Sequence, residues 1–420
     1  MQRNKAVIII LIVAAIVIVA LAAFYFYFMG GTAPIGNGVE VPISQGGNGS
    51  SNQSGGGQNG TTTSQQGGGQ SGPGFVNQPQ TYNKLRELSS LPVAGAIIFD
   101  TTNTFVRYME RGHGFIYETQ AESKDTPVRI SDTTIIPQIY EAYFTNKGQG
   151  VIVRYLKEPN DIIQTFYTSL KTTSSSTLSL ANGIFLPPEI QALSVSPSQS
   201  KIFYLVQNGS NGAVGIVSNP DGSNKSQIFS SPLNEWLALW QQESSVTLFT
   251  KPSVHAVGYA YLVDSKSGAQ KRVLGDIKGL TVLPNNDSSL FLYSAPQTGN
   301  FLGLSVIDAA KQSSSASSVA TLPEKCVWSV LNKSIVFCAV PDSPPLVDYP
   351  DSWYRGDIFF SDKIEKINLK TGQTEIILDP QTLASRTMDI TNLALSPKEN
   401  YLLFTNKKDL TLWLLDLSAK

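Results

Sequence analysis

The sequence has little cysteine, little histidine and little charge. Two cysteines and two histidines in 420 residues are too few for a disulfide framework or for a zinc site with several ligands. Charged residues make up 15% of the chain, below the quarter that is usual in soluble domains. Lys plus Arg number 31 against 32 Asp plus Glu, and this balance argues against a general nucleic-acid binder. We therefore expect no metal site and no nucleic-acid partner.

Motifs for nucleotide binding and catalysis are also missing. The chain has no Walker loop, EF-hand loop or Rossmann fingerprint, and it has no G-x-S-x-G nucleophile elbow. His113 and His255 fall in loops of different repeats, so surface histidines are a simpler interpretation than a shared metal site. The sequence thus predicts no catalytic residue and no cofactor.

One long hydrophobic run stands near the N-terminus. Residues 6–28 contain no charge and no proline, which is about the length needed to cross a ~30 Å hydrocarbon core. Arg3 and Lys5 precede the run and no positive charge follows until Lys84, so we expect residues 1–5 in the cytoplasm. The run is too long for the apolar region of a cleaved signal peptide. It predicts a single-pass signal-anchor helix in the plasma (inner) membrane, with the lipid bilayer as its partner.

A polar, glycine-rich segment follows the hydrophobic run. Residues 29–82 are mostly Gly, Ser, Gln, Asn and Thr. Such a composition buries too little apolar surface to offset the entropy of ordering. We expect a disordered, flexible linker that holds residues 83–420 outside the cytoplasm.

Residues 83–420 contain a repeated β-pattern. A short apolar strand is followed by a turn and a second, more strongly apolar strand, as in VIVRYL, KIFYLV and YLLFT. Seven repeats can be counted, and the first strand of each ends at residue 100, 145, 196, 241, 284, 331 or 396. Most intervals lie near the 40–50 residues typical of a four-stranded propeller blade. The pattern predicts an all-β, seven-bladed β-propeller.

The two ends of this region complement each other. The last repeat has three strands, the third at about residues 410–417, and no outer strand follows. The first repeat is preceded by an extra strand, Lys84 to Leu88. We expect this extra strand to complete the last blade and close the ring, which leaves no unpaired sheet edge.

The repeats resemble the WD-repeat-like propellers of the TolB-like kind. Ser396-Pro397, the strand Tyr401 to Phe404 and the strand Leu412 to Asp416 carry the resemblance, and Ser196-Pro197 begins a second copy. The resemblance implies a propeller fold. It does not imply a TolB-like role in envelope transport.

Cys326 and Cys338 flank a predicted hairpin, KCVWSVLNKSIVFC. If the turn centres on Asn332, the two sulfurs face each other, and a disulfide can form outside the cytoplasm. A shift of one residue in register would separate the pair. Two buried free thiols are therefore slightly favoured.

The sixth repeat contains a loop much longer than the others, PDSPPLVDYPDSWYRGD at residues 341–357. Four prolines limit the entropy lost when the loop is ordered, and Tyr, Trp and Arg are the residue types that anchor interfaces. The alternative is that the aromatic side chains fold back over their own blade. The candidate binding residues are Asp348, Tyr349, Asp351, Trp353, Tyr354 and Arg355.

Two functions are compatible with this organisation. The first is a membrane-tethered, non-enzymatic binding or scaffold module for a protein or polysaccharide of the cell envelope, and the missing catalytic motifs favour it. The second is an extracytoplasmic hydrolase or lyase that acts on envelope carbohydrate or peptide. A pocket lined by two or more carboxylates with raised pKa values would favour the enzyme, and a wide, shallow face would favour binding.

Overall fold

The computed structural model describes residues 81–82, 84–158, 162–172, 178–180, 183–209, 212–294 and 302–419. The predicted transmembrane helix at residues 6–28 lies outside these residues, as does nearly all of the predicted linker. Within the described part of the chain, no helix has both the length and the apolar character required to cross a membrane.

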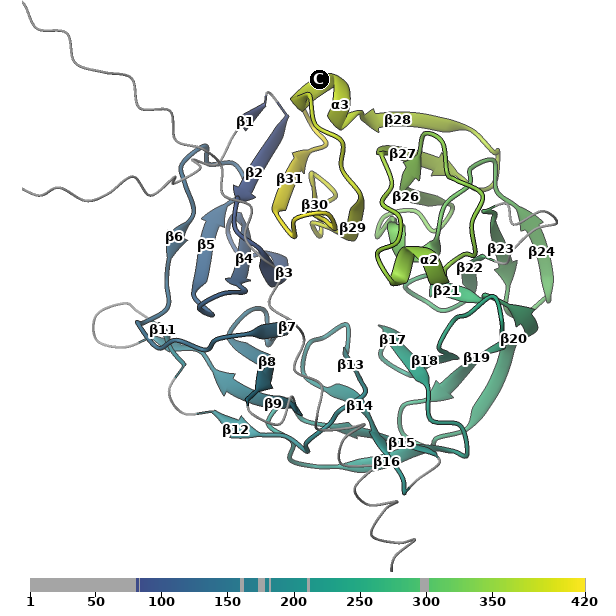
Figure 1. Ribbon diagram of the computed structural model, residues 1–420, viewed down its shortest axis with the longest axis horizontal. Helices are drawn as coiled ribbons and strands as arrows, with labels where there is room; N and C mark the ends of the chain where they lie inside the picture. The colour runs from purple at the N-terminus through teal and green to yellow at the C-terminus, as the bar shows by residue number, and fades with distance from the viewer. Residues whose placement is uncertain are drawn as a thin grey trace, which may run out of the picture. The chain divides into compact units, whose positions relative to one another are not determined.

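Seven antiparallel sheets form a ring, with the first strand of each blade nearest the centre (Figure 1). Blades one to three contain β3 (Val93–Asp100), β4 (Thr104–Glu110), β5 (Ile116–Gln120) and β6 (Val128–Arg129); β7 (Ile139–Thr145), β8 (Gly150–Lys157), β9 (Ile162–Ser169) and β12 (Ile184–Phe185); and β13 (Ala192–Val195), β14 (Ile202–Gln207), β15 (Ala213–Ser218) and β16 (Ser226–Ser231). A small hairpin, β10 (Lys171–Thr172) with β11 (Leu178–Ser179), follows β9.

Blades four and five contain β17 (Trp236–Gln242), β18 (Ser245–Thr250), β19 (Val257–Asp264) and β20 (Gln270–Lys278); and β21 (Thr281–Pro284), β22 (Leu290–Ser294), β23 (Leu304–Asp308) and β24 (Ser313–Ala316). Blade six has η1 (Pro323–Lys325), β25 (Cys326–Trp328), β26 (Ile335–Pro341), α2 (Asp351–Tyr354), β27 (Asp362–Asn368), β28 (Thr374–Leu378) and α3 (Pro380–Ala384). Blade seven has β29 (Ile390–Leu395), β30 (Tyr401–Asn406) and β31 (Leu412–Asp416), completed by β2 (Leu85–Ser89) and β1 (Thr81–Tyr82). The prediction of a seven-bladed β-propeller is confirmed.

The second strand of a blade is its most deeply buried strand. The first five residues of β8 and all residues of β30 are buried, and β14 has four consecutive buried residues. Neighbouring blades cover both faces of these strands, so the sequence is continuously apolar instead of alternating. Each fully buried Leu, Ile, Val or Phe side chain contributes about 1.5–3 kcal/mol, and the contacts between blades therefore hold the ring together.

The ring is closed by the N-terminal strand, as predicted. β2 pairs with β31, with Leu85 opposite Leu415 and Arg86 opposite Leu414. Leu85 and Leu88 are fully buried and belong to different core clusters, because they project toward the two neighbouring blades. The outward edge of β31 is therefore paired.

Serine in the Ser-Pro pairs shapes the turn between the first two strands of a blade. The Ser396 hydroxyl accepts the backbone N–H of Tyr401 at 3.0 Å, and Ser196 accepts that of Lys201 at 3.1 Å. In blade five Asn285 takes the same position. The repeated motif therefore stabilises the turn between the first and second strands.

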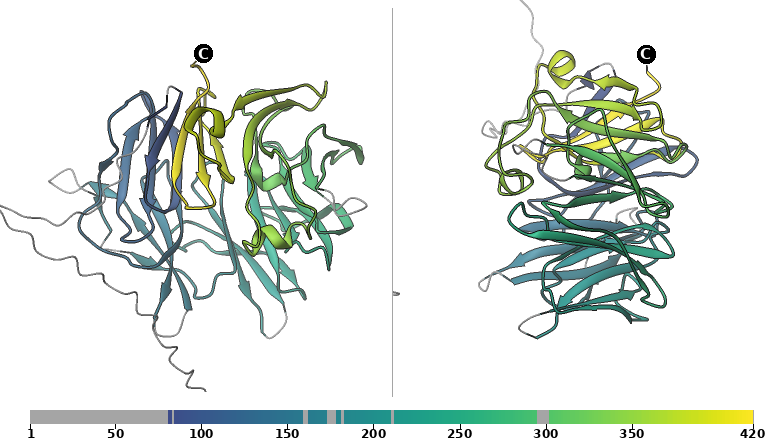
Figure 2. Two further views of the ribbon diagram at one scale, coloured as in Figure 1. Left: turned by 45° about the horizontal axis from the view of Figure 1, so that its top comes forward. Right: turned by 90° about the vertical axis from the view of Figure 1, so that its right-hand side faces the viewer.

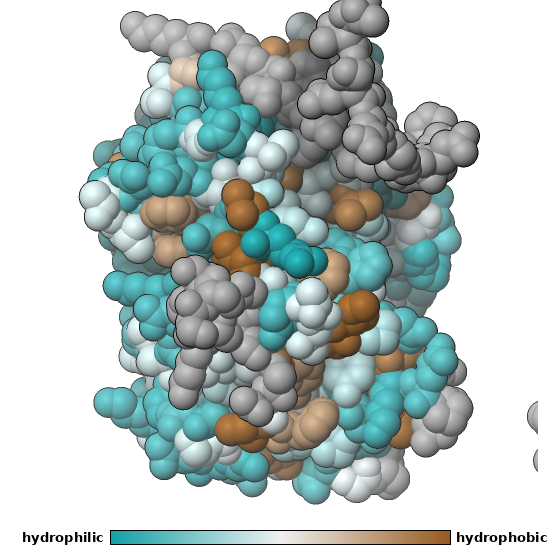
Figure 3. Space-filling view, turned by 90° about the vertical axis from the view of Figure 1, so that its left-hand side faces the viewer, coloured by the Kyte–Doolittle hydropathy of each residue, from teal (hydrophilic) through white to brown (hydrophobic). Residues whose placement is uncertain are grey.

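Loops leave the disc on two opposite faces (Figure 2). Because the strands are antiparallel, the loops between second and third strands share one face with the connections between blades. The rim over the first two blades is mainly polar with separate apolar patches (Figure 3), and β6 and β12 expose Val128, Ile184 and Phe185.

Candidate functional site

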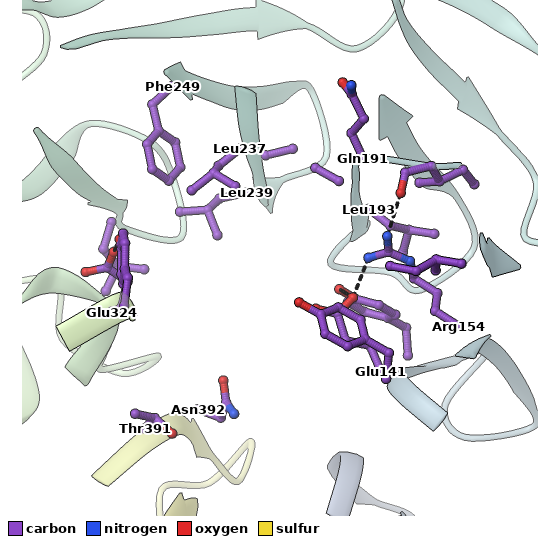
Figure 4. Close-up of a pocket in the computed structure, with 18 of the residues that line it drawn as sticks. Glu141, Arg154, Gln191, Leu193, Leu237, Leu239, Phe249, Glu324, Thr391 and Asn392 are labelled. Atoms are coloured by element: carbon purple, nitrogen blue, oxygen red, sulfur yellow. Dashed lines mark hydrogen bonds and ion pairs between the residues drawn. The ribbon is translucent and has the colours of Figure 1, made fainter. Parts of the chain in front are cut away.

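A pocket of about 1150 Å³ lies at the centre of the ring (Figure 4). The first strands of blades two to seven line it, and residues from the loop face complete it. Its charged lining residues are Glu141, Arg154, Glu189, Glu324 and Lys407. Leu193, Leu237, Leu239 and Phe249 supply an apolar surface between them.

The long loop of blade six forms part of the pocket wall. It leaves β26, forms the short helix α2 and returns to β27. Tyr349 and Trp353 are buried in a cluster with Phe360, whose ring centroid lies 6.0 Å from that of Tyr349 and 6.1 Å from that of Trp353. These two aromatic side chains fold inward, as in the alternative stated above, and fix the loop on its own blade. Both side chains are largely excluded from solvent, and Trp353 also lines the central pocket.

A buried charge cluster lies beneath this loop. The Lys325 ammonium is 2.8 Å from the Asp362 carboxylate and 2.5 Å from that of Asp389, and all three side chains are excluded from solvent. The Trp353 indole N–H donates to Asp389 at 2.9 Å. Burial raises the pKa of Asp362 to about 6, although Lys325 opposes the shift. The cluster joins η1, β27 and the connection before β29, and so fixes the residue next to Lys325, which is Glu324.

Glu324 is a carboxyl of the central pocket whose pKa is raised. It is partly buried, and its Oε1 accepts a hydrogen bond from the Tyr354 hydroxyl. Its Oε2 is buried and has no hydrogen-bond partner among the described residues. Burial raises the pKa of Glu324, and the bond from Tyr354 and the charge of Lys325 only partly offset the effect. The pKa of Tyr354 is also raised, first by burial and then by the carboxylate of Glu324.

The opposite wall holds a second carboxylate (Figure 4). Glu141 forms an ion pair with Nη1 of Arg154 and accepts the Tyr143 hydroxyl at 2.9 Å. Both bonds end on Oε2 of Glu141. The Arg154 guanidinium also donates to the Ile190 carbonyl at 2.5 Å, so this group is held rigidly. Burial raises the pKa of Tyr143.

The remaining predicted binding residues lie in α2 or within a few residues of its ends. Asp351 accepts the backbone N–H of Val254 at 2.8 Å, which ties the loop to blade four. Asp348 lies 3.6 Å from His255, and Arg355 pairs with Asp357 at 2.8 Å. Tyr354 is 37% exposed and reaches the central pocket.

The two histidines stand apart. His113 contacts Glu110 with 3.1 Å between Nδ1 and Oε2, while His255 is near Asp348. In the described ranges, no group of three or more His, Cys, Asp and Glu side chains is arranged to hold a metal ion.

Cys326 and Cys338 form a disulfide, so the preference for free thiols is wrong. The two residues are direct partners across β25 and β26, and their sulfurs are 2.10 Å apart. The pairing is centred on Asn332, which places both side chains on the same side of the sheet.

Sequence reasoning missed Glu324. The residues just before the first strands of blades six and seven are charged, with Glu324 and Lys325 before β25 and Asp389 before β29, but the exposed Glu235 stands at the same position before β17. Equivalent positions in blades one, two and three are uncharged. A charge at this register therefore does not by itself distinguish a carboxyl of the central pocket from a surface carboxyl.

Comparisons with known proteins establish the fold. No protein-family profile and no curated sequence matches the chain. Prolyl oligopeptidase B from Galerina marginata matches with a TM-score of 0.52 and 10% identity over 78% of this chain and 49% of that one. An oligogalacturonate lyase in complex with manganese matches with a TM-score of 0.50 and 9% identity, over 80% and 98%. One structure from a study of two prolyl endopeptidases gives 0.50 and 10%, over 81% and 46%.

These comparisons contradict the prediction of a non-enzymatic binding module. The three propellers named above come from lyase and peptidase enzymes, and the enzyme alternative agrees with them better. At about 10% identity the likeness concerns the fold alone, so the reaction is argued from the pocket.

Proposed function

We propose that this chain is an enzyme that hydrolyses neutral carbohydrate chains in its central pocket, with Glu324 as the general acid. The observation that carries the proposal is the environment of Glu324. One oxygen is held by Tyr354 and the other is buried without a partner among the described residues. A raised pKa keeps a proton on such a carboxyl at higher pH, which is the property that a general acid needs.

Cleavage of a glycosidic bond needs an acid for the leaving oxygen and a water molecule for the anomeric carbon. Glu324 gives its proton to the glycosidic oxygen as the bond between that oxygen and the anomeric carbon breaks. A water molecule adds to this carbon, and a carboxylate on the far side takes its proton. Glu141 on the opposite wall (Figure 4) is assigned this role, because its Oε1 is not engaged by Arg154 or Tyr143; the role requires roughly 6.5–9.5 Å between the two carboxyl groups. Solvent then takes the proton from Glu141 and returns a proton to Glu324, so that both carboxyls regain their starting states.

The charges of the pocket favour an uncharged substrate. With Glu324 protonated, the carboxylates of Glu141 and Glu189 balance the cations of Arg154 and Lys407. Gln191, Gln207, Gln241 and Asn392 add amide groups, which can donate to and accept from hydroxyl groups. The apolar wall offers a surface for the C–H face of a sugar ring.

The test is the hydrolysis of soluble, neutral polymers of glucose and of N-acetylglucosamine. The rate is measured by the number of reducing ends released. Glu324→Gln should lower the rate at least ~100-fold, as the loss of a general acid does. Glu375→Gln is the matched control, because Glu375 is exposed on the outer strand β28. Equal rates for the two variants would refute the role of Glu324.

The location of the enzyme is part of the proposal. Residues 6–28 are proposed as a single-pass anchor and residues 29–82 as the linker, with the propeller outside the cytoplasm. The Cys326–Cys338 disulfide supports an oxidising compartment, and the hairpin serines support kinship with TolB-like propellers. Protease added to intact spheroplasts should degrade the propeller, and complete protection would exclude this topology.

A further inference from the structure

A second pocket lies on the same face of the disc, between α2 and blade four. Its volume is about 580 Å³, within the ~300–1,000 Å³ that is usual for ligand sites. It is lined by Leu233, Asn234, Glu235, Thr250, Lys251, Pro252, Ser253, Ala256, Val257, Asp351, Tyr354 and Arg355.

The two pockets share one side chain. Tyr354 lines both of them, and its hydroxyl donates to Glu324. Blade four also contributes to both, with Leu237 in the central pocket and Glu235 in the second. The second pocket is therefore adjacent to the central one, and the Tyr354 ring forms part of the wall between them.

The walls of the second pocket are held in place and balanced in charge. Asp351 accepts the N–H of Val254 at 2.8 Å, so α2 is fixed to the loop of blade four. Lys251 pairs with Glu235 at 2.8 Å. Pro252, Ala256 and Val257 provide an apolar surface beside these polar groups.

We infer that the second pocket binds further sugar units of the same neutral carbohydrate chain whose bond is cleaved in the central pocket. The inference rests on the proposed function and makes it more specific, because it predicts a preference for long chains over short ones. The combination of an apolar surface, amide and hydroxyl groups and paired charges matches the alternating C–H and hydroxyl surfaces of an uncharged sugar.

The test measures binding, so that it is independent of turnover. Neutral glucose and N-acetylglucosamine oligomers of increasing length are titrated by calorimetry into the full-length Glu324→Gln chain. Ala256→Trp fills the second pocket, since Ala256 is an exposed lining residue. Ala310→Trp is the control, because Ala310 is exposed in the turn between β23 and β24, on the opposite face.

The affinity for long oligomers should fall about tenfold in Ala256→Trp, while the affinity for the shortest oligomer that binds should not change. Ala310→Trp should leave the affinity for every oligomer unchanged. Equal length dependence in both tryptophan variants would overturn the second site while leaving the proposed reaction intact. Length-dependent binding without hydrolysis by the wild type would overturn the reaction and keep the site. No binding of any oligomer would overturn both.

Discussion

Leucine 85 gives the sharpest test of how the ring is closed. Its side chain is fully buried in β2 and belongs to the cluster formed by blades six and seven, which includes Ile364 and Leu402. We consider the substitution Leu85→Ala, which shortens the side chain and leaves the backbone pairing of β2 with β31 in place.

The expected cost combines lost burial with the cavity that remains. Truncation of a fully buried leucine costs about 3–5 kcal/mol, because the surrounding core relaxes only in part. Leu91 lies a few residues further along the chain and is 52% exposed, so Leu91→Ala should change the free energy of unfolding by at most about 0.5 kcal/mol. The two substitutions remove the same atoms from sites that differ in burial.

Urea denaturation followed by tryptophan fluorescence measures the difference. The midpoint should fall markedly for Leu85→Ala and stay near the wild-type value for Leu91→Ala. A chain that begins at residue 83 should likewise fold, whereas one that begins at residue 91 should aggregate through the exposed edge of β31. Equal midpoints for the two alanine variants would show that β2 does not complete the last blade.

Trp353→Ala should lower the free energy of unfolding by about 3–5 kcal/mol, because the ring is buried and its N–H donates to Asp389; an unchanged urea midpoint would contradict this packing. Asp362 has a pKa near 6 in the folded chain against an ordinary 3.8, so its contribution to stability falls as the pH rises from about 4 to about 6, because the unfolded chain releases this proton first. Asp362→Asn should remove that part of the pH dependence of the urea midpoint; a pH dependence equal to that of the wild type would be evidence against it. Tyr354→Phe removes a bond that lowers the pKa of Glu324, so carboxyl NMR should detect a further rise in that pKa, and a fall would reverse the assigned role of the hydroxyl.

The fold could be predicted from the sequence because its main signals are local. Second strands such as YLLFT are continuously apolar, and each is preceded by a turn. Closure could be predicted as well, since the extra strand at Lys84 to Leu88 has only one open place in the ring. Both predictions use only the positions and spacing of the apolar strands along the sequence, and neither requires knowledge of side-chain contacts.

The long loop shows why side-chain roles were harder to predict. A buried aromatic cluster and an exposed interface use the same residue types, so the composition of residues 341–357 did not distinguish them. Trp353 is buried against Phe360, and its N–H donates to Asp389 in the next blade. The prediction for Cys326 and Cys338 was limited in a similar way. The sequence did not determine the register of the two strands to within one residue, and a shift of one residue would have separated the two sulfurs.

The central site depends on contacts within blade six and with the neighbouring blade seven. Burial raises the pKa of Glu324, Tyr354 from the long loop donates to its carboxylate, and its neighbour Lys325 contacts Asp389, 64 residues further along the chain. Such a carboxyl looks like any surface glutamate in the sequence. Its character becomes visible only when the ring is assembled.

The pKa of Glu324 is the quantity on which the proposed enzyme depends. It can be measured by carbon-13 NMR of the side-chain carboxyls, with Glu324→Gln to assign the signal, beside the pH dependence of glycan hydrolysis. The pKa should lie above the ordinary 4.5, and hydrolysis should decline as the pH rises through the same value, because the acid loses its proton. A carboxyl that titrates at its ordinary pKa, or a hydrolysis profile that Glu324→Gln leaves unchanged, would contradict general acid catalysis by Glu324.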